Sequence, residues 1–461
     1  MVFSSLLFVF GFLPLFLSGY VALPDRYRNA WALVGSCLFY AWGGGSFIFV
    51  LLGSLMLDFS VAKRLERSMR KLWLAVGLAA NLGLLVYFKY AEFGYGMLRD
   101  LGAVPGGDAP GWVQVALPIG ISFFTFQKIS YLVDVYRRVK GPLSRFADYA
   151  LYVVLFPQLI AGPIVRYQDL ADQISERTTS YDDRIVGFVR FAVGLAKKVL
   201  IANNLGAIAD PIFAHDPVSG ASAWTALLAY SFQIYFDFSG YSDMAIGLGR
   251  MMGFRFMENF NMPYRAQSVT EFWRRWHISL GTWMRDYLYI PLGGSKLGTG
   301  RTYVNLVVVF ACSGLWHGAS WNFVVWGLYH GLWLVMERLA LGFRWPRIPA
   351  ALRTLATFAV VTVGWVLFRV ESLADAGTWI GALVCFDGAL DPHAHVYAAL
   401  GIAALASFWP VRRSWDHAEA AYLSRTGGRS LIWPLLAVLL VLASSAKLAT
   451  SGYNPFIYFR F

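Results

Sequence analysis

Charged residues are scarce in this sequence. Asp, Glu, Lys and Arg together make up 14% of the 461 residues, whereas they make up about 25% of a typical soluble domain. Hydrophobic residues make up 57% of the chain. This balance excludes a water-soluble globular protein, because water solvates such a surface poorly. The chain is therefore expected to fold in a lipid bilayer.

Cysteine is also rare. The three cysteines, Cys37, Cys312 and Cys385, lie in apolar stretches and show no CxxC spacing. This pattern predicts neither a disulfide framework nor a metal site. Cys312 could in principle act as a nucleophile, but a buried free cysteine usually behaves as a small hydrophobic side chain.

Acidic residues are outnumbered by basic ones, 27 against 39, which gives a formal net charge of +12. The basic residues stand in short clusters between apolar runs, so they are expected to set membrane topology and not to bind nucleic acid. Clusters at residues 26–28, 63–71 and 137–140 follow three of these runs. They predict that these loops face the cytoplasm and that the N-terminus lies outside.

Apolar runs recur along the whole chain. A bilayer span needs about 20 residues, and shorter runs can serve as half-spans among neighbouring helices. The runs are Val2–Leu23, Ala30–Trp42, Phe47–Val61, Leu72–Phe93, Trp112–Val135, Tyr149–Ala161, Ile185–Ile201, Trp224–Phe236, Val304–Leu315, Trp321–Met336, Leu355–Leu367, Trp379–Cys385, Val396–Phe408 and Leu431–Ala443. They predict an all-α, polytopic membrane protein with about 11–13 transmembrane or re-entrant helices.

No linker, low-complexity tract or internal repeat interrupts this pattern. We therefore expect a single transmembrane domain over residues 1–461, with a catalytic core at about residues 112–340. The first run lacks the basic start of a cleaved signal and is expected to remain as the first span. The polar stretch Arg412–Ser430 is interpreted as a loop.

Polar residues gather in apolar surroundings between Ser231 and Trp326. Each central charge costs about 2.5–3.5 kcal/mol on insertion scales, so such residues often mark function. In the segment 235–244, Asp237 and Asp243 stand among aromatic residues, and Gly240 is a candidate helix break. Asp237, Ser239 and Ser242 can cap or hydrogen-bond local backbone at that break, while Asp237 is also a candidate residue of a substrate tunnel.

The segment 271–286 resembles a helix lying in the membrane interface, because Trp273, Trp276 and Leu280 recur at helical spacing. Three arginines on its other faces are candidates for binding lipid headgroups or an anionic cofactor: Arg274, Arg275 and Arg285. His277 in the same segment is either a structural histidine satisfied by a neighbour or part of a catalytic site.

The segment Ser313–Trp321 places His317 inside a long apolar region between glycines. A buried imidazole without a partner is costly, and glycines permit close approach of backbone or substrate, so His317 is the main candidate catalytic residue. The alternative is a satisfied core histidine. Ser313 stands four residues earlier and could orient the ring on a continuous helix. Trp316, Ser313 and His330 are further tunnel candidates.

Several longer motifs occur in a fixed order along the chain. They include Leu117-Pro-Ile-Gly-Ile-Ser-Phe, Phe156-Pro-Gln-Leu-Ile-Ala-Gly-Pro, Tyr235-Phe-Asp-Phe-Ser-Gly-Tyr-Ser-Asp-Met, Glu271-Phe-Trp-Arg-Arg-Trp-His-Ile-Ser-Leu, Gly314-Leu-Trp-His-Gly, Gly364-Trp-Val-Leu-Phe-Arg and Pro455-Phe-Ile-Tyr-Phe-Arg-Phe. Through these motifs nearly the whole chain resembles the membrane-bound O-acyltransferase family, and most closely its bacterial alginate O-acetylase branch. A departure is Arg460, where the family usually has Gln.

This resemblance implies a ring of tilted helices around a central tunnel, with His317 as the essential histidine and His277 in a second motif position. It implies O-acetylation of an exopolysaccharide, most directly alginate, in the bacterial inner membrane. Acetyl-CoA is the expected cytoplasmic donor, with no permanently bound cofactor. The expected partners are a periplasmic acetyltransferase, the polysaccharide and membrane lipid.

Other functions remain open at this stage. Relatives that acylate cellulose or load D-alanine onto teichoic acids share the central motifs. Buried Asp, His and Arg residues also mark transport pathways, so a non-enzymatic polysaccharide transporter is an alternative. A haem protein with His277 and His317 as ligands is a third possibility.

Overall fold

The computed structural model describes residues 2–104, 109–160, 162–217, 219–340, 348–385, 387–389, 393–408, 431–455 and 457. All regular structure in these residues is helical, which confirms the predicted all-α class. The chain divides into two compact units, one of residues 1–187 and 245–257 and one of residues 188–244 and 258–461. The predicted loop Arg412–Ser430 and Arg460 lie outside the described residues. The single-domain boundary, the span count, the tunnel and the orientation stay predictions.

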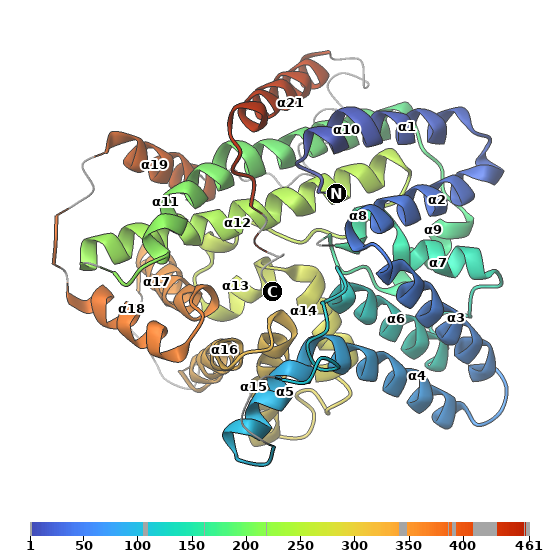
Figure 1. Cartoon of the computed structure of the whole chain (residues 1–461), viewed down its shortest axis with the longest axis horizontal. Helices are drawn as coiled ribbons and strands as arrows, with labels where there is room; N and C mark the ends of the chain where they lie inside the picture. The colour runs from blue at the N-terminus through green and yellow to red at the C-terminus, as the bar shows by residue number, and fades with distance from the viewer. Residues whose placement is uncertain are drawn as a thin grey trace. The chain divides into compact units, whose positions relative to one another are not determined.

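The first unit is built mainly from the N-terminal helices (Figure 1). Its elements are η1 (Phe8–Phe12), α1 (Leu13–Ala22), α2 (Asp25–Gly44), α3 (Phe47–Leu65), α4 (Arg70–Leu85), η2 (Val86–Tyr90), α5 (Ala91–Asp100), α6 (Ile121–Tyr136), α7 (Phe146–Val154), α8 (Phe156–Leu159) and α9 (Tyr167–Ser175). Helices α3, α4 and α6 pack against one another, and a buried ion pair joins Lys128 Nζ to Asp58 Oδ2 at 3.3 Å. This pair satisfies two charges that lipid cannot solvate.

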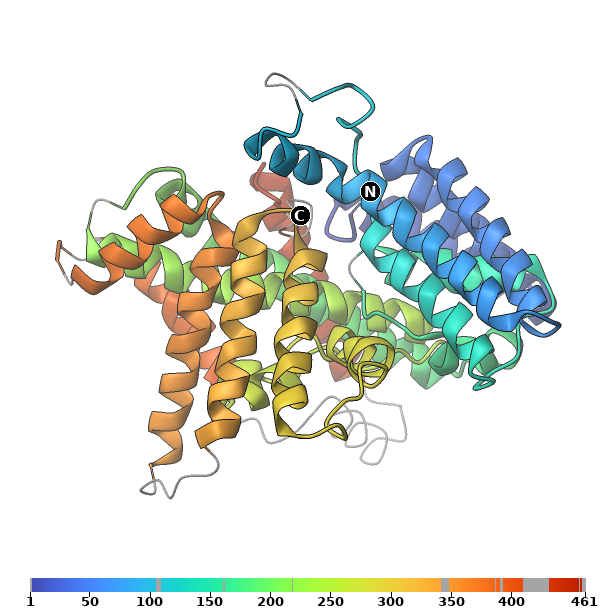
Figure 2. The ribbon, with the colours of Figure 1, turned by 90° about the horizontal axis from the view of Figure 1, so that it is seen from below.

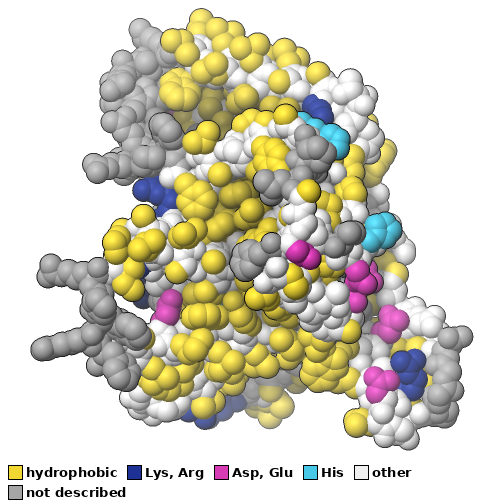
Figure 3. Space-filling view, turned by 90° about the vertical axis from the view of Figure 1, so that its left-hand side faces the viewer, with side chains coloured by type: hydrophobic (Ala, Val, Ile, Leu, Met, Phe, Trp, Pro, Cys, Tyr) yellow, Lys and Arg dark blue, Asp and Glu magenta, His cyan; other side chains and the backbone are white. Residues whose placement is uncertain are grey.

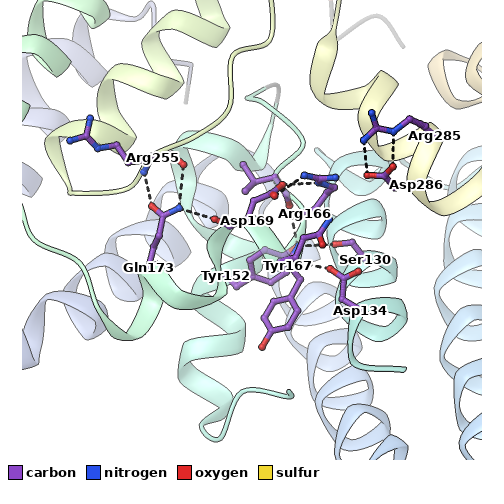
Figure 4. A network of polar contacts seen from close by, with 12 residues as sticks. Ser130, Asp134, Tyr152, Arg166, Tyr167, Asp169, Gln173, Arg255, Arg285 and Asp286 are labelled. Carbon is purple, nitrogen blue, oxygen red and sulfur yellow. Dashed lines mark hydrogen bonds and ion pairs between the residues drawn. The ribbon is translucent and has the colours of Figure 1, made fainter. Parts of the chain in front are cut away.

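A polar network anchors the start of α9 in this unit (Figure 4). The backbone N–H of Tyr167 donates to Ser130 Oγ at 3.2 Å, and the N–H of Gln168 donates to Asp134 Oδ2 at 3.1 Å. Both acceptors belong to α6. The first turn of a helix has N–H groups without intrahelical partners, so two side chains of α6 cap α9 and join these helices.

The second unit carries the motifs that the sequence singles out. Its elements are the greater part of α10 (Tyr181–Ala196) and of α12 (Gly220–Met251), with η3 (Lys197–Ala202), α11 (Asn203–Phe213), η4 (Pro263–Arg265), α13 (Val269–Arg275), α14 (Ile278–Met284), η5 (Arg285–Tyr289), α15 (Thr299–His317), α16 (Trp321–Ala340), α17 (Ala350–Arg369), α18 (Leu373–Cys385), α19 (Ala394–Phe408) and α21 (Ile432–Thr450). Helices α15, α16 and α17 stand side by side (Figure 2).

Three helical stretches among the described residues are long and apolar enough to cross a bilayer: Arg70–Asp100, Ala350–Arg369 and Ile432–Thr450. Shorter apolar helices at Phe8–Ala22, Leu373–Cys385 and Ala394–Phe408 accompany them. The face in Figure 3 is covered largely by hydrophobic side chains with few charged ones between them. These features fit a membrane protein, because such a surface is stable against lipid and not against water.

The predicted helix break at Gly240 is wrong. Helix α12 runs without interruption from Gly220 to Met251. Gly240 instead permits close packing, since a Cβ there would lie 2.7 Å from the carbonyl oxygen of Gly194 in α10. A Cβ on Gly194 would lie 2.5 Å from the carbonyl oxygen of Gly240. Small residues at such crossings let two helix backbones approach each other in membranes.

The Gly240→Ala variant is expected to be less stable by about 1–3 kcal/mol, because the added methyl group forces α10 and α12 apart. Thermal unfolding of the purified protein in detergent would measure the loss. Gly401→Ala in α19 is the matched control, because no atom lies within 4 Å of a Cβ at that position. Equal melting temperatures for the two variants would contradict this interpretation of the crossing.

Candidate active site

His277 lies at a sharp break between two short helices. Its backbone has φ 46° and ψ 52°, the left-handed conformation, which ends α13 and starts α14. The predicted continuous interfacial helix over residues 271–286 is therefore wrong. A non-glycine residue rarely adopts this conformation, and where it does the surrounding contacts usually compensate for the strain.

Contacts at its N-terminus hold α13 in place. Ser268 Oγ accepts the backbone N–H of Glu271 at 3.0 Å. The carboxylate of Glu337 in α16 accepts the N–H of Val269, and also the N–H and hydroxyl of Thr270 at 2.8 and 2.7 Å. A carboxylate at a helix N-terminus satisfies free N–H groups and matches the positive end of the helix dipole. Helix α16 thus positions the segment that leads into His277.

Asn259 organises the contacts of His277. Its side-chain Oδ1 lies 3.1 Å from His277 Nδ1, and it accepts the hydroxyl of Ser279 at 2.8 Å and the backbone N–H of Ser279 at 3.2 Å. The carbonyl oxygen of Asn259 also accepts the N–H of Ile278 at 3.0 Å. Asn259 and His277 are both buried. Burial lowers the pKa of His277 well below its ordinary value, so the ring is neutral.

Sequence reasoning missed Asn259. It stands in the segment that follows α12, where a single asparagine most often forms a local turn. Its contact with His277 spans 18 residues of sequence. No spacing rule connects the two positions, so only the tertiary structure reveals this partner.

His317 is the last residue of α15, and its ring lies in an aromatic environment. Its centroid is 4.9 Å from Trp316, 5.2 Å from Trp326 and 5.2 Å from Phe368. The centroids of His317 and His277 are 6.4 Å apart. The structure thus brings together the two histidines that the sequence singles out, in a region from which water is largely excluded.

Glycines allow this close arrangement of α15 and α16. A Cβ on Gly314 would overlap the backbone of Phe323, and a Cβ on Gly327 would overlap the backbone of Phe310. The motif Gly-Leu-Trp-His-Gly is therefore constrained by backbone packing as well as by its histidine. Helix α15 is continuous through Gly314, which answers a question that the sequence leaves open.

His330 lies in contact with Trp326, at 5.1 Å between centroids, and with Trp273 at 4.9 Å. A Cβ on Gly364 of α17 would lie 2.8 Å from His330 Nε2, so the small residue makes room for the ring. Trp326 thus contacts both His317 and His330. His330 packs among large aromatic side chains.

A cavity of about 500 Å³ opens beside His277. Its walls are mostly apolar, and Ser313 and His277 provide polar groups. Three arginines also line it: Arg274, Arg285 and Arg338. Arginines can bind phosphate groups through their planar fork of N–H donors. The cavity therefore combines an apolar interior with cationic groups suited to an anionic ligand.

The three arginines that the sequence predicts to bind an anionic ligand differ in their positions relative to the cavity. Arg274 and Arg285 line the cavity, and Arg285 Nε also contacts Asp286 at 2.7 Å. Arg275 is absent from the cavity lining, and it forms an ion pair with Glu271 at 2.6 Å. Arg338 lies in α16. The sequence did not identify it as a binding residue, because its neighbours in the chain predict only the end of a helix.

Sequence comparisons show which known proteins this chain is similar to. Residues 136–371 match the sequence model of the membrane-bound O-acyltransferase family. The chain is 43% identical to a probable alginate O-acetylase AlgI of Pseudomonas putida over the full length of both proteins. It is 37% identical to a peptidoglycan O-acetyltransferase of Helicobacter pylori, over 84% of this chain and 80% of that protein. A teichoic acid D-alanyltransferase of Bacillus subtilis is 28% identical over 54% and 68% of the two chains.

The chain belongs to the membrane-bound O-acyltransferase family. It is an acyltransferase enzyme and a membrane protein. The matched region contains α13 to α17 with His277, His317 and the three arginines of the cavity. The catalytic roles of His277 and His317 stay predictions at this point.

Asp237 of this acyltransferase lies in a buried ion pair. Its Oδ1 is 2.8 Å from Lys198 Nζ, and its Oδ2 accepts the backbone N–H of Ile457 at 2.9 Å. Asp243, on the same helix, pairs with Arg190 at 2.9 Å and Lys197 at 2.6 Å. The predicted local backbone capping at a helix break is therefore wrong for Asp237. These carboxylates join α12 to α10, η3 and the C-terminal segment.

Asp237→Ala is expected to destabilise the protein by about 3–5 kcal/mol, because Lys198 would stay buried without its carboxylate. Thermal unfolding in detergent would measure this effect. The double variant Asp237→Ala, Lys198→Met is expected to regain most of the stability. A double variant that is stable but has lost acyl transfer would instead indicate that Asp237 contacts substrate.

Proposed function

We propose that the protein transfers an acetyl group from acetyl-CoA for the O-acetylation of an exopolysaccharide, alginate in the first instance. The observation that carries the proposal is the pair of buried imidazoles beside an apolar cavity lined by three arginines. The names of the similar proteins of Pseudomonas putida and Helicobacter pylori support O-acetyl transfer to a polysaccharide. The bacterial inner membrane is the proposed location.

The donor would bind with its phosphates at Arg274, Arg285 and Arg338 and with its thioester arm in the apolar cavity. All three arginines are exposed, whereas the cavity reaches the fully buried His277. Charge-assisted hydrogen bonds to phosphate are among the strongest available to a protein surface. The phosphates of acetyl-CoA match the three arginines, and its thioester arm matches the apolar walls of the cavity.

His317 would act as the general base. A neutral imidazole nitrogen takes the hydroxyl proton while the hydroxyl oxygen bonds to the acetyl carbonyl carbon. The carbon–sulfur bond then breaks, and the imidazolium returns the proton to the leaving thiolate. General base catalysis contributes about 10²–10⁴-fold, so alignment of the two substrates has to supply much of the remaining acceleration. His277 would orient the donor or hold the thioester carbonyl.

The acceptor hydroxyl would belong to a periplasmic partner acetyltransferase, which passes the acetyl group to the polysaccharide. Transfer to another polymer is a second candidate, because the similar proteins include a peptidoglycan O-acetyltransferase and a teichoic acid D-alanyltransferase. Assays with alginate, peptidoglycan and teichoic acid acceptors would separate these possibilities. Transport without acyl transfer disagrees with membership of an acyltransferase family.

His317→Ala is expected to lower acetyl transfer by at least about 100-fold, because the base is removed. Radiolabelled acetyl-CoA, the purified protein and a periplasmic acceptor would provide the assay. His215→Ala is the control, since His215 is an exposed residue after α11. Full transfer by a folded His317→Ala protein would rule out this role.

Arg338→Ala is expected to raise the KM for acetyl-CoA by about 10-fold with kcat within about 3-fold, because a charged hydrogen bond contributes about 1.5–3 kcal/mol. Steady-state kinetics would separate the two constants. Arg275→Ala removes the same charge from a side chain outside the cavity lining, so its KM should stay near the wild-type value. A larger effect for Arg275→Ala than for Arg338→Ala would contradict this binding site.

A further inference from the structure

The hydrogen bonds around Asn259 determine which nitrogen of His277 carries a proton. The backbone N–H of Ser279 points at the side-chain amide of Asn259 at 3.2 Å. A backbone N–H can only donate, so the amide atom facing it has to be the oxygen Oδ1 and not the nitrogen Nδ2. The same oxygen faces His277 Nδ1 at 3.1 Å.

An amide oxygen can only accept, so His277 Nδ1 has to be the donor of this hydrogen bond. A neutral imidazole carries one N–H, and its other nitrogen then has a lone pair. His277 is buried to 1% exposure, and burial lowers the pKa of its ring, so the neutral form prevails. The Nε2 atom of His277 is therefore a hydrogen-bond acceptor.

This acceptor is buried and has no hydrogen-bond partner among the residues that the structure describes. A buried polar atom left in this state costs free energy, and most such atoms in proteins have a partner. His277 also lines the cavity, together with the three arginines, and its ring centroid lies 6.4 Å from that of His317. A ligand in this cavity can supply the missing donor.

We propose that Asn259 is a positioning residue that holds His277 in the Nδ1–H tautomer, and that His277 Nε2 accepts an N–H hydrogen bond from the arm of the acyl donor. This inference rests on the proposed function. It selects between the two roles considered for His277, because a nitrogen without a proton cannot donate to the thioester carbonyl. His277 orients the donor.

The tautomer of His277 also restricts which acyl donors can form this hydrogen bond. A pantetheine arm has amide N–H groups near its thioester, and these match an acceptor nitrogen inside an apolar cavity. Acetyl phosphate has no N–H group and cannot form this bond. The arm of acetyl-CoA therefore provides both the apolar length and the donor that the site requires, while its phosphates face the arginines.

The first test measures the tautomer of His277 in the absence of substrate. The full-length protein, labelled with ¹⁵N at histidine, is examined by NMR in detergent or lipid, and a His277→Gln variant assigns the signal. The expected result is a protonated Nδ1 and an unprotonated Nε2 for His277. A protonated Nε2 in the wild-type protein would overturn the proposal, whether or not acetyl-CoA proves to be the donor.

The second test uses Asn259→Leu, which removes the acceptor oxygen at similar volume. The expected result is a KM for acetyl-CoA and a Kd for CoA that rise by about 3- to 10-fold, with kcat within about 3-fold, because one neutral hydrogen bond is lost. The NMR signal of His277 should then show the Nε2–H tautomer. An unchanged Kd for CoA with a changed tautomer would overturn the proposed contact with the arm.

Ser279→Ala is the matched control for packing damage, because it removes a hydroxyl that donates to Asn259 Oδ1 and lies 3.5 Å from His277 Nδ1, while the contact between Asn259 and His277 stays in place. Its KM should stay within about 2-fold of the wild-type value. If Ser279→Ala raised the KM as much as Asn259→Leu does, the positioning role of Asn259 would be overturned. If wild-type protein neither binds CoA nor turns over acetyl-CoA, the proposed donor is wrong, while the tautomer measurement still stands by itself.

Discussion

The structure depends on one constraint: a polar group that is removed from both water and lipid headgroups needs a partner inside the protein. Asp58 with Lys128, and Asp237 with Lys198, satisfy this constraint by pairing. The side-chain oxygen of Asn259 satisfies it with three contacts. His277 Nε2 has no hydrogen-bond partner among the described residues, and His277 lines the cavity in which the acyl donor is proposed to bind.

Close backbone packing is what places the imidazoles. Glycines at 314 and 327 let α15 and α16 touch along their backbones, and Gly364 leaves space for His330. Trp326 then lies in contact with His317 and His330 at once. Because interiors of this kind are close-packed, a side chain has little freedom to adjust. The geometry of the site is thus set by small residues that carry no chemistry of their own.

The candidate site could be predicted in part. His277 and His317 stand out because ionisable residues in apolar surroundings are costly. Arg274 and Arg285 stand out by their position near them. The break at His277 could not be predicted, because the spacing of Trp273, Trp276 and Leu280 suits a continuous helix. Arg275 pairs with Glu271, four residues before it on the same helix. Ion pairs at this spacing are common on helices. The ion pair competes with ligand binding for the guanidinium group.

The sequence by itself determined the all-α class, the membrane environment and the two histidines, because hydrophobic runs and isolated polar residues are local properties of the chain. Only the tertiary structure decided that Asn259 holds His277 and that Arg338 joins the cavity. It also showed that Gly240 packs against Gly194 inside a continuous helix. Each of these depends on atoms brought together from distant segments, and the free energy of such contacts is absent from any single stretch of sequence.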